Sequence, residues 1–364
     1  MPRIRQWLST ARWGVLLGAL ALGGCRRPSA PATDGAPRLS ARPAAPAPVP
    51  APPEEFDYGR LARRAFRAAS APAGLSAAKV LLGRRLFHEP ALSADGTVSC
   101  ASCHPLDRGG ADGRRRSPGV RGALGAVNTP TVLNVGTHVA WFWDGRAASL
   151  EEQVSGPVTN PVEMASTWPR VVAALRRSES YRAAFAEAYP DGVTAANARD
   201  AIATFERTLV TPSRLDQYLL GDEGALAPDE LAGLRVFLRA GCQECHNGVG
   251  VGGGSFQRMS RHGDYFAARG DASPADLGRY NVTRRDEDRR VFRVPTLRNV
   301  ARTAPYFHDG HPATLDDAVR LMARHQVGRE FTDAEVRAVV CFLRSLDEGV
   351  APSAAACATP SPAR

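Results

Sequence analysis

The stretches Cys100-Ala101-Ser102-Cys103-His104 and Cys242-Gln243-Glu244-Cys245-His246 decide the fold of this chain. Both have the pattern C-x-x-C-H, which is the attachment signature of a c-type haem. The two thiols form thioether bonds with one porphyrin, and the histidine is the proximal ligand of its iron. The alternative is a pair of Cys-x-x-Cys redox or zinc sites, but neither chemistry needs the adjacent histidine. The sequence therefore predicts two covalent haem c groups, held by Cys100, Cys103 and His104 and by Cys242, Cys245 and His246.

Each motif belongs to one copy of an internal repeat. Residues 130–154 align without a gap with residues 295–319: the first copy contains Phe-Trp-Asp-Gly where the second has Phe-His-Asp-Gly. A similar apolar stretch precedes each haem motif, at 80–87 and at 231–238. Such a repeat indicates two related modules. We therefore expect a mainly α-helical protein of two tandem class I cytochrome c-like domains, each enclosing one haem.

The coarse pattern predicts helices joined by loops that wrap the haem groups, with few strands. The expected helices cover residues 77–87, 149–154, 169–175, 180–188, 195–209, 228–240, 315–325 and 333–346. Asp333, with Glu335 just after it, is expected to be the N-cap of the last helix.

The N-terminus has the pattern of a bacterial export signal. Basic residues precede a short apolar run, which is shorter than the about 20 residues that span a bilayer. Leu22-Gly23-Gly24-Cys25 then resembles a lipobox. We expect residues 1–24 to be a lipoprotein-type signal peptide and Cys25 to be a lipid anchor, with an ordinary cleaved signal as the alternative. Either interpretation predicts a periplasmic protein.

Composition predicts the remaining boundaries. Residues 25–54 are rich in Ala and Pro and are expected to form an extended tether. An N-terminal domain is expected over 55–225, a C-terminal domain over 226–349 and a flexible tail over 350–364.

The net charge of +9 is carried almost entirely by arginine, since Lys79 is the only lysine. The arginines are scattered among acidic residues, so we expect no nucleic-acid partner, although a basic rim for an acidic partner stays open. Of the seven cysteines, Cys341 and Cys357 are left without a predicted role. They form either a disulfide that ties the tail to the last helix, or a buried thiol and a loose tail cysteine.

The two copies differ where a sixth iron ligand would stand. In the second copy Met322 follows Val319 by about one turn, and its thioether is the expected ligand, with Met259 as the competitor. His/Met ligation raises the reduction potential and suits a site that accepts electrons. The position matching Met322 in the first copy is Pro157, which binds no iron. There Glu163 is the candidate general acid and base for peroxide cleavage, and Gln153 the candidate hydrogen-bond donor.

These residues together resemble the bacterial dihaem cytochrome c peroxidase family, with the methylamine-utilisation dihaem branch as its near relative. The resemblance covers nearly all of 82–346. Besides the haem motifs it is carried by segments 86–87, 92–93, 109–113, 128–131, 142–146, 161–164, 294–299 and 305–310.

The resemblance implies a role for each site residue. The haem on His104 would be the peroxidatic centre, with Glu163 and Gln153 beside it, and the haem on His246 and Met322 would accept electrons. Trp143 would relay electrons between them, and His308 would lie near a propionate of the second haem. A calcium ion would be held by oxygen atoms of Asn128, Thr303 and Pro305. A homodimer is also implied.

One position departs from the family pattern. Members commonly carry a histidine that caps the peroxidatic iron until the other haem is reduced, and the matching residue here is Val120. Because an aliphatic side chain cannot bind iron, we expect an enzyme that needs no reductive activation. His138 is the nearest alternative cap.

The predicted function is the reduction of hydrogen peroxide to water with electrons from a small periplasmic cytochrome c or a cupredoxin. One alternative is a dihaem enzyme that oxidises a side chain of a partner protein, as the methylamine-utilisation branch does. That branch also lacks the capping histidine but has tyrosine where Met322 stands. A second alternative is a lipid-anchored electron carrier without enzymatic activity.

Overall fold

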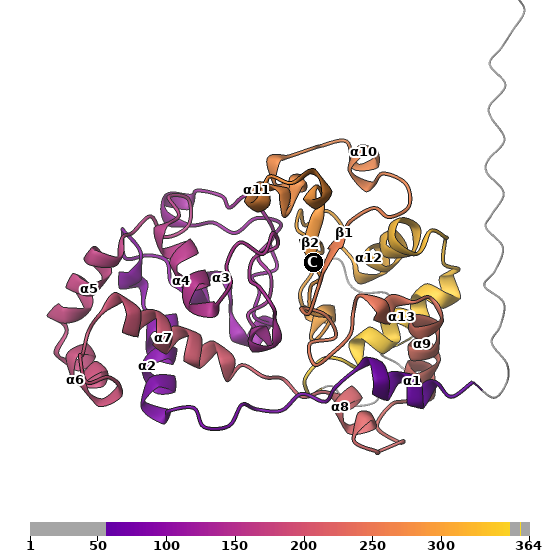
Figure 1. The fold of residues 1–364 in the computed structure, drawn as a ribbon, viewed down its shortest axis with the longest axis horizontal. Coiled ribbons are helices and arrows are strands. Elements are labelled where there is room, and N and C mark those ends of the chain that lie inside the picture. Colours follow the sequence, from indigo (N-terminus) through magenta and orange to yellow (C-terminus); the bar gives the residue numbers. More distant parts are fainter. Residues whose placement is uncertain (1–55, 350–356, 358–364) are drawn as a thin grey trace, which may run out of the picture. The chain divides into compact units, whose positions relative to one another are not determined.

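Each half of the fold is built around one pair of packed helices (Figure 1). In the computed structural model, which describes residues 56–349 and Cys357, α2 (Ala77–Phe87) packs on α7 (Ala195–Arg207). In the same way α9 (Pro228–Arg239) packs on α13 (Asp333–Arg344). A Cβ at Gly83 would lie 1.9 Å from the carbonyl oxygen of Ala201, and one at Gly233 would lie 1.9 Å from that of Ala338. A glycine thus allows the close approach in both pairs, and the two halves repeat one packing.

The other elements surround these pairs. The helices are α1 (Tyr58–Ala65), α3 (Cys100–Cys103), α4 (Leu150–Thr159), α5 (Trp168–Arg177), α6 (Glu179–Ala188), α8 (Arg214–Leu219), α10 (Tyr265–Arg269), α11 (Tyr280–Thr283) and α12 (Leu315–Met322). Strands β1 (Phe256–Arg258) and β2 (Val291–Arg293) form one antiparallel pair. The expectation of a mainly helical protein is confirmed.

The expected helices are present, with shifts at their ends. The helix expected over 315–325 is α12, which ends at Met322 and continues as a π-helical turn over Ala323–Val327. Asp333 as N-cap was wrong: Thr332 caps α13, because its hydroxyl accepts the Glu335 amide hydrogen at 3.2 Å, and the Glu335 carboxylate accepts the Thr332 amide hydrogen. Asp333 is the first residue of the helix.

Helices α1 and α8 were not expected, and both pack against the second half. Ala62 of α1 and the adjoining Phe66 are fully buried in one apolar cluster with Leu215 of α8 and Phe342 of α13. In Figure 1, α1 lies beside α9 although it is the first described helix of the chain. A second cluster, between α2 and α7, forms the core of the first half. The boundaries at 225 and 349 stay predictions.

A single threonine joins the two copies of the repeat. Asn134 and Asn299 hold equivalent positions and share a left-handed backbone, with φ of 61° and 60°. Their side-chain amides donate to the same hydroxyl, that of Thr211, at 2.7 and 2.6 Å. All three residues are buried, so the connection between α7 and α8 is fixed to both copies at once.

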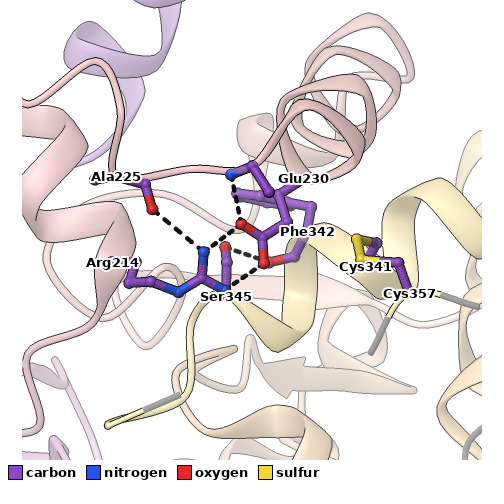
Figure 2. The surroundings of a disulfide bond; sticks show 8 residues. Arg214, Ala225, Glu230, Cys341, Phe342, Ser345 and Cys357 are labelled. Atoms are coloured by element: carbon purple, nitrogen blue, oxygen red, sulfur yellow. Dashed lines mark hydrogen bonds and ion pairs between the residues drawn. A yellow bond between two sulfur atoms is a disulfide. The ribbon is translucent and has the colours of Figure 1, made fainter. Parts of the chain in front are cut away.

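A disulfide joins Cys341 of α13 to Cys357, and Figure 2 shows its surroundings. Nearby, Arg214 forms a buried ion pair with Glu230 of α9. The first of the two sequence interpretations therefore holds: the tail is tied to the last helix. Cys25, the signal peptide, the tether and the rest of the tail lie outside the described residues. Within 56–349, the helices are all too short or too polar to cross a bilayer.

Candidate haem-binding sites

The second haem motif opens on a cavity of about 390 Å³. Cys242 begins a 3₁₀ turn directly after α9, and Cys242, Cys245 and His246 all line the cavity. Met322, at the end of α12, lines the same cavity. The fold therefore brings two thiols, an imidazole and a thioether to the wall of one cavity. These donors, and the largely apolar wall, fit a covalently attached haem.

Both motif histidines are held as neutral imidazoles. Burial lowers the pKa of His104, and its Nδ1 lies 3.0 Å from the carbonyl oxygen of Gly110. Burial lowers the pKa of His246 to about 4, against the opposing effect of the Pro295 carbonyl. The Pro130 carbonyl acts on His104 in the same way, and Pro130 and Pro295 are equivalent in the repeat. In His104 one nitrogen faces a carbonyl, which keeps the other nitrogen available to iron, whereas Nδ1 of His246 has no hydrogen-bond partner among the described residues.

The motif thiols do not have the electrostatics of a redox pair. Burial raises the pKa of Cys103 to about 11 and that of Cys242 to about 12. Catalytic Cys-x-x-Cys thiols have the opposite shift. Among the residues that the structure describes, the only cluster of three His, Cys, Asp or Glu side chains within metal-binding reach is Glu230 with the disulfide pair Cys341 and Cys357. Both observations favour haem attachment over redox or zinc chemistry.

Two methionines line the second cavity, and their surroundings differ. The Met259 sulfur lies 3.4 Å from the side-chain nitrogen of Gln326, which donates to it. Met322 directly precedes the π-helical turn, a feature that is frequent at functional sites. Both methionines line the cavity, so the choice of Met322 over Met259 as the iron ligand stays a prediction.

In the first half, Glu163 lies close to the haem motif. Its negative charge contributes to the raised pKa of Cys103. Asn160 donates to its Oε1 at 2.6 Å, while burial raises the pKa of the carboxyl above its ordinary value. Gln153 is half-buried on α4. Within 56–349 the structure shows no direct hydrogen bond between the side chains of Gln153 and Glu163.

The loop that carries Val120 is packed against Glu163. The Val120 amide donates to the Glu163 carbonyl oxygen at 2.8 Å, and Val120 is 4% exposed within the apolar cluster between α2 and α7. A Cβ at the neighbouring Gly119 would lie 2.1 Å from the Val162 carbonyl oxygen. The position of the expected capping residue is thus held in the core by an aliphatic side chain. His138, the alternative cap, instead lines the cavity of the second motif.

Trp143 and His308 are repeat equivalents, and they meet between the two halves. Their ring centroids are 6.4 Å apart at 69°. The Trp143 indole donates to the Asn128 carbonyl at 2.9 Å. Reciprocal backbone hydrogen bonds complete the contact: the Asn128 amide donates to His308 at 2.8 Å, and the Arg293 amide donates to Trp143 at 2.9 Å. His308 Nε2 also lies 2.7 Å from Asp276 Oδ1.

The residues predicted to hold calcium come together, but nothing among the described residues identifies an ion. Asn128, Thr303 and Pro305 all line the second cavity. The Asn128 side-chain nitrogen donates to the Arg114 carbonyl at 2.9 Å. Calcium binding therefore stays a prediction.

Two residues of the cavity wall were missed or misjudged from sequence, namely Arg293 and His138. Arg293 could have been found from sequence, because it is a charged residue inside the apolar run Val291-Phe292-Arg293-Val294. His138 carried no signal that distinguishes the two sites.

Comparisons with known proteins agree with this geometry. The profile of the family described as Di-haem cytochrome c peroxidase matches residues 77–224. Cytochrome c peroxidase Ccp of Escherichia coli is 48% identical over 273 residues, which cover 74% of this chain and 58% of that protein. Cytochrome c551 peroxidase of Nitrosomonas europaea is 47% identical over 267 residues, which cover 73% of this chain and 78% of the relative.

More distant relatives belong to the methylamine-utilisation branch. Methylamine utilization protein MauG of Methylorubrum extorquens is 33% identical over 75% of this chain and 79% of its own length. Among solved structures, a MauG-like protein associated with microbial copper homeostasis superposes with a TM-score of 0.67. It is 29% identical, and the match covers 78% of this chain and 93% of the other.

Proposed function

Because this chain belongs to the di-haem cytochrome c peroxidase family, we propose that it reduces hydrogen peroxide to water without prior reductive activation. Its two haem groups supply an iron that binds peroxide and a second iron that takes up electrons one at a time. We assign the first to a peroxidatic domain over 55–225 and the second to an electron-transfer domain over 226–349. Both domains are proposed to be of the class I cytochrome c type.

Glu163 is proposed to act as general acid and base. Its carboxylate takes a proton from one peroxide oxygen and returns it to the other, so that two electrons and two protons convert one peroxide into two waters. The raised pKa of this carboxyl supports the role, because it moves the group toward neutral pH. Gln153 holds the substrate by a hydrogen bond. It is the repeat equivalent of Ala318, which lines the second cavity, and this supports its facing the first site.

The single observation that carries the absence of an activation step is the environment of Val120. The loop is held by the Val120–Glu163 backbone hydrogen bond, and its side chain is packed in the core. A valine offers no donor to iron, and His138 lies in the other cavity. The first site is therefore open to peroxide in the oxidised enzyme.

On the electron-accepting side, His246 and Met322 are proposed to ligate the second iron. Trp143 carries electrons toward the first site, supported by its position against His308 and Asn128. His308 is proposed to lie near a haem propionate. A calcium ion held by oxygen atoms of Asn128, Thr303 and Pro305 would stiffen this contact region.

We propose that the donor is a small cytochrome c or a cupredoxin in the periplasm. Lipid attachment at Cys25 and a homodimer complete the proposal. A protein-modifying activity like that of the methylamine-utilisation branch is disfavoured, because Met322 suits an electron acceptor.

The test is a stopped-flow assay of the fully oxidised enzyme, never exposed to a reductant, mixed with peroxide and reduced small cytochrome c. Immediate turnover is expected, together with a high-spin ferric signal in the resting EPR spectrum. Two low-spin haem signals, with turnover only after one-electron reduction, would contradict the proposal.

A further inference from the structure

Two buried polar side chains in the wall of the second cavity have no ion-pair partner among residues 56–349. Arg293 and His138 line this cavity together with His246 and Met322. Arg293 is 3% exposed and His138 is 8% exposed. They come from different halves of the chain, since His138 follows the first haem motif and Arg293 ends β2. The site is therefore assembled only when the two halves meet.

Arg293 is a buried cation without a carboxylate. Its Nε lies 3.3 Å from the Phe142 carbonyl oxygen and its Nη1 3.4 Å from that of Val294, both long for hydrogen bonds. Within residues 56–349, no Asp or Glu oxygen forms an ion pair with it. Burial lowers the pKa of Arg293 to about 10. An unpaired buried charge is costly, so the position favours an anion in the cavity.

His138 is an unsatisfied imidazole at the same place. Neither of its ring nitrogens has a hydrogen-bond partner in the part of the chain that the structure describes. Burial, reinforced by the positive charge of Arg293, lowers its pKa well below the ordinary value, so the ring is neutral and presents one N–H. The ring packs on Gly253, where a Cβ would lie 2.3 Å from His138 Cδ2. The glycine makes room for the ring beside the cavity.

We propose that Arg293 and His138 together bind one carboxylate of the group that fills this cavity, namely a propionate of the haem attached at Cys242 and Cys245. The assignment rests on the proposed haem attachment at the second motif. His308 is a weaker partner for that propionate, because its Nε2 is already hydrogen-bonded to Asp276. A guanidinium and an N–H donor match the two oxygens of one carboxylate.

The site would couple the propionate to the electron path. The Arg293 amide donates to the Trp143 carbonyl at 2.9 Å, so the same residue holds the backbone of the proposed relay. A guanidinium that neutralises the propionate also reduces the electrostatic penalty for adding an electron to the iron. Arg293 therefore raises the reduction potential of the second haem, and His138 adds a smaller effect in the same direction.

The experiment compares Arg293→Gln, Arg293→Lys and His138→Leu in the holoenzyme. Arg258→Gln, an exposed arginine on β1, and His88→Leu, an exposed histidine after α2, are the matched controls. The readouts are the midpoint potential of the second haem and the propionate-bending band in the resonance Raman spectrum. Arg293→Gln is expected to disfavour the ferrous state at least tenfold, which is 59 mV for one electron.

Smaller shifts in the same direction are expected for Arg293→Lys and His138→Leu, and none for the two controls. In the double variant Arg293→Gln with His138→Leu, the shift is expected to differ from the sum of the single shifts, because both residues contact one carboxylate. Unchanged potential and Raman bands in Arg293→Gln and His138→Leu would overturn the proposal. If Arg293→Gln does not retain its haem, the midpoint potentials and Raman bands of Arg293→Lys and His138→Leu still test the proposal.

A pyridine haemochrome assay of the wild type, which counts haem groups per chain, tests haem attachment at the second motif separately from propionate binding by Arg293 and His138. Two haem groups per chain support the premise, and one per chain, together with no change on replacing Cys242 and Cys245 by alanine, refutes the attachment itself. A wild type with two haem groups but no potential shift in the variants refutes only the carboxylate site.

Discussion

The two copies of the repeat share backbone features and differ in many of their side chains. Both place a proline carbonyl beside the motif histidine and a threonine hydroxyl on a glycine carbonyl of the following loop. At equivalent positions, however, the first copy has Trp143 and Pro157 where the second has His308 and Met322. We propose that the duplicated scaffold holds two haem groups, and that differences at such positions assign one group to the substrate and the other to electron uptake.

The helix pairs differ in the same way. Phe205 packs on Gly83 and Phe342 packs on Gly233, so these two phenylalanines hold equivalent positions. The next residue in each helix, Glu206 or Leu343, is therefore also equivalent. Leu343 lines the second cavity, whereas Glu206 is a buried carboxyl, and its Oε2 has no hydrogen-bond partner among the described residues. At this position the second half therefore has an apolar side chain, and the first half has a buried carboxylic acid.

The largest effect is expected from Glu163→Gln, which removes the proposed acid–base group from the first copy. Peroxide turnover is expected to fall by about 10³ because proton transfer in the transition state is lost. Glu187→Gln, at an exposed position of α6, is the matched control and is expected to be neutral. Steady-state assays with reduced cytochrome c check both. Wild-type turnover in Glu163→Gln would exclude the assignment.

The next prediction tests whether the sixth coordination position of the first haem iron is free in the oxidised enzyme. Val120→His places an iron ligand where the family commonly has one. Turnover of the oxidised enzyme is expected to fall by about 10² until one haem is reduced, as for a capped state that is favoured about 99 to 1 over the open one. The resting EPR spectrum should lose its high-spin signal. Val120→Leu keeps an aliphatic side chain and should retain immediate turnover. If Val120→His turned over as fast as Val120→Leu, the loop would not reach the iron.

A third substitution tests the electron-accepting copy. Met322→Leu removes the proposed thioether ligand, and the midpoint potential of the second haem is expected to fall by on the order of 100 mV. Met259→Leu is the control and should leave the potential unchanged. Spectroelectrochemical titration measures both. The reverse result would transfer the ligand role to Met259.

The smallest effect concerns Glu206. Burial raises its pKa to about 8, from an ordinary value of 4.5. The folded state thus favours the protonated acid, so stability is fully present below pH 4.5 and is lost as the pH rises toward 8. Glu206→Gln cannot ionise and is expected to be more stable than the wild type by on the order of 2 kcal/mol at pH 8, but not at pH 4.5. Urea unfolding at both pH values, with Glu187→Gln alongside, measures the difference. A gain that is equal at both pH values would contradict this account.

Sequence patterns identified what is local or repeated. The haem motifs and the helices over 77–87 and 228–240 follow from short-range pattern, and the family and the peroxidase function are confirmed by the relatives. The packing of α1 on α9 was not predictable, because its apolar partners lie far along the chain. The presence of Arg293 and His138 in one cavity wall depends on contacts between segments far apart in the chain, which no linear pattern records. The roles of Glu163 and Gln153 stay predictions.

The Cys341–Cys357 disulfide has a consequence for how the chain matures. Four cysteines must reach haem attachment as thiols, whereas these two must be oxidised in the same compartment. Closing a Cys-x-x-Cys pair costs less chain entropy than closing a loop of 16 residues, so indiscriminate oxidation acts first on the wrong pairs. We expect haem attachment to precede formation of the Cys341–Cys357 disulfide. A production host rich in thiol oxidants should yield chains whose haem motifs are oxidised to disulfides and carry no haem.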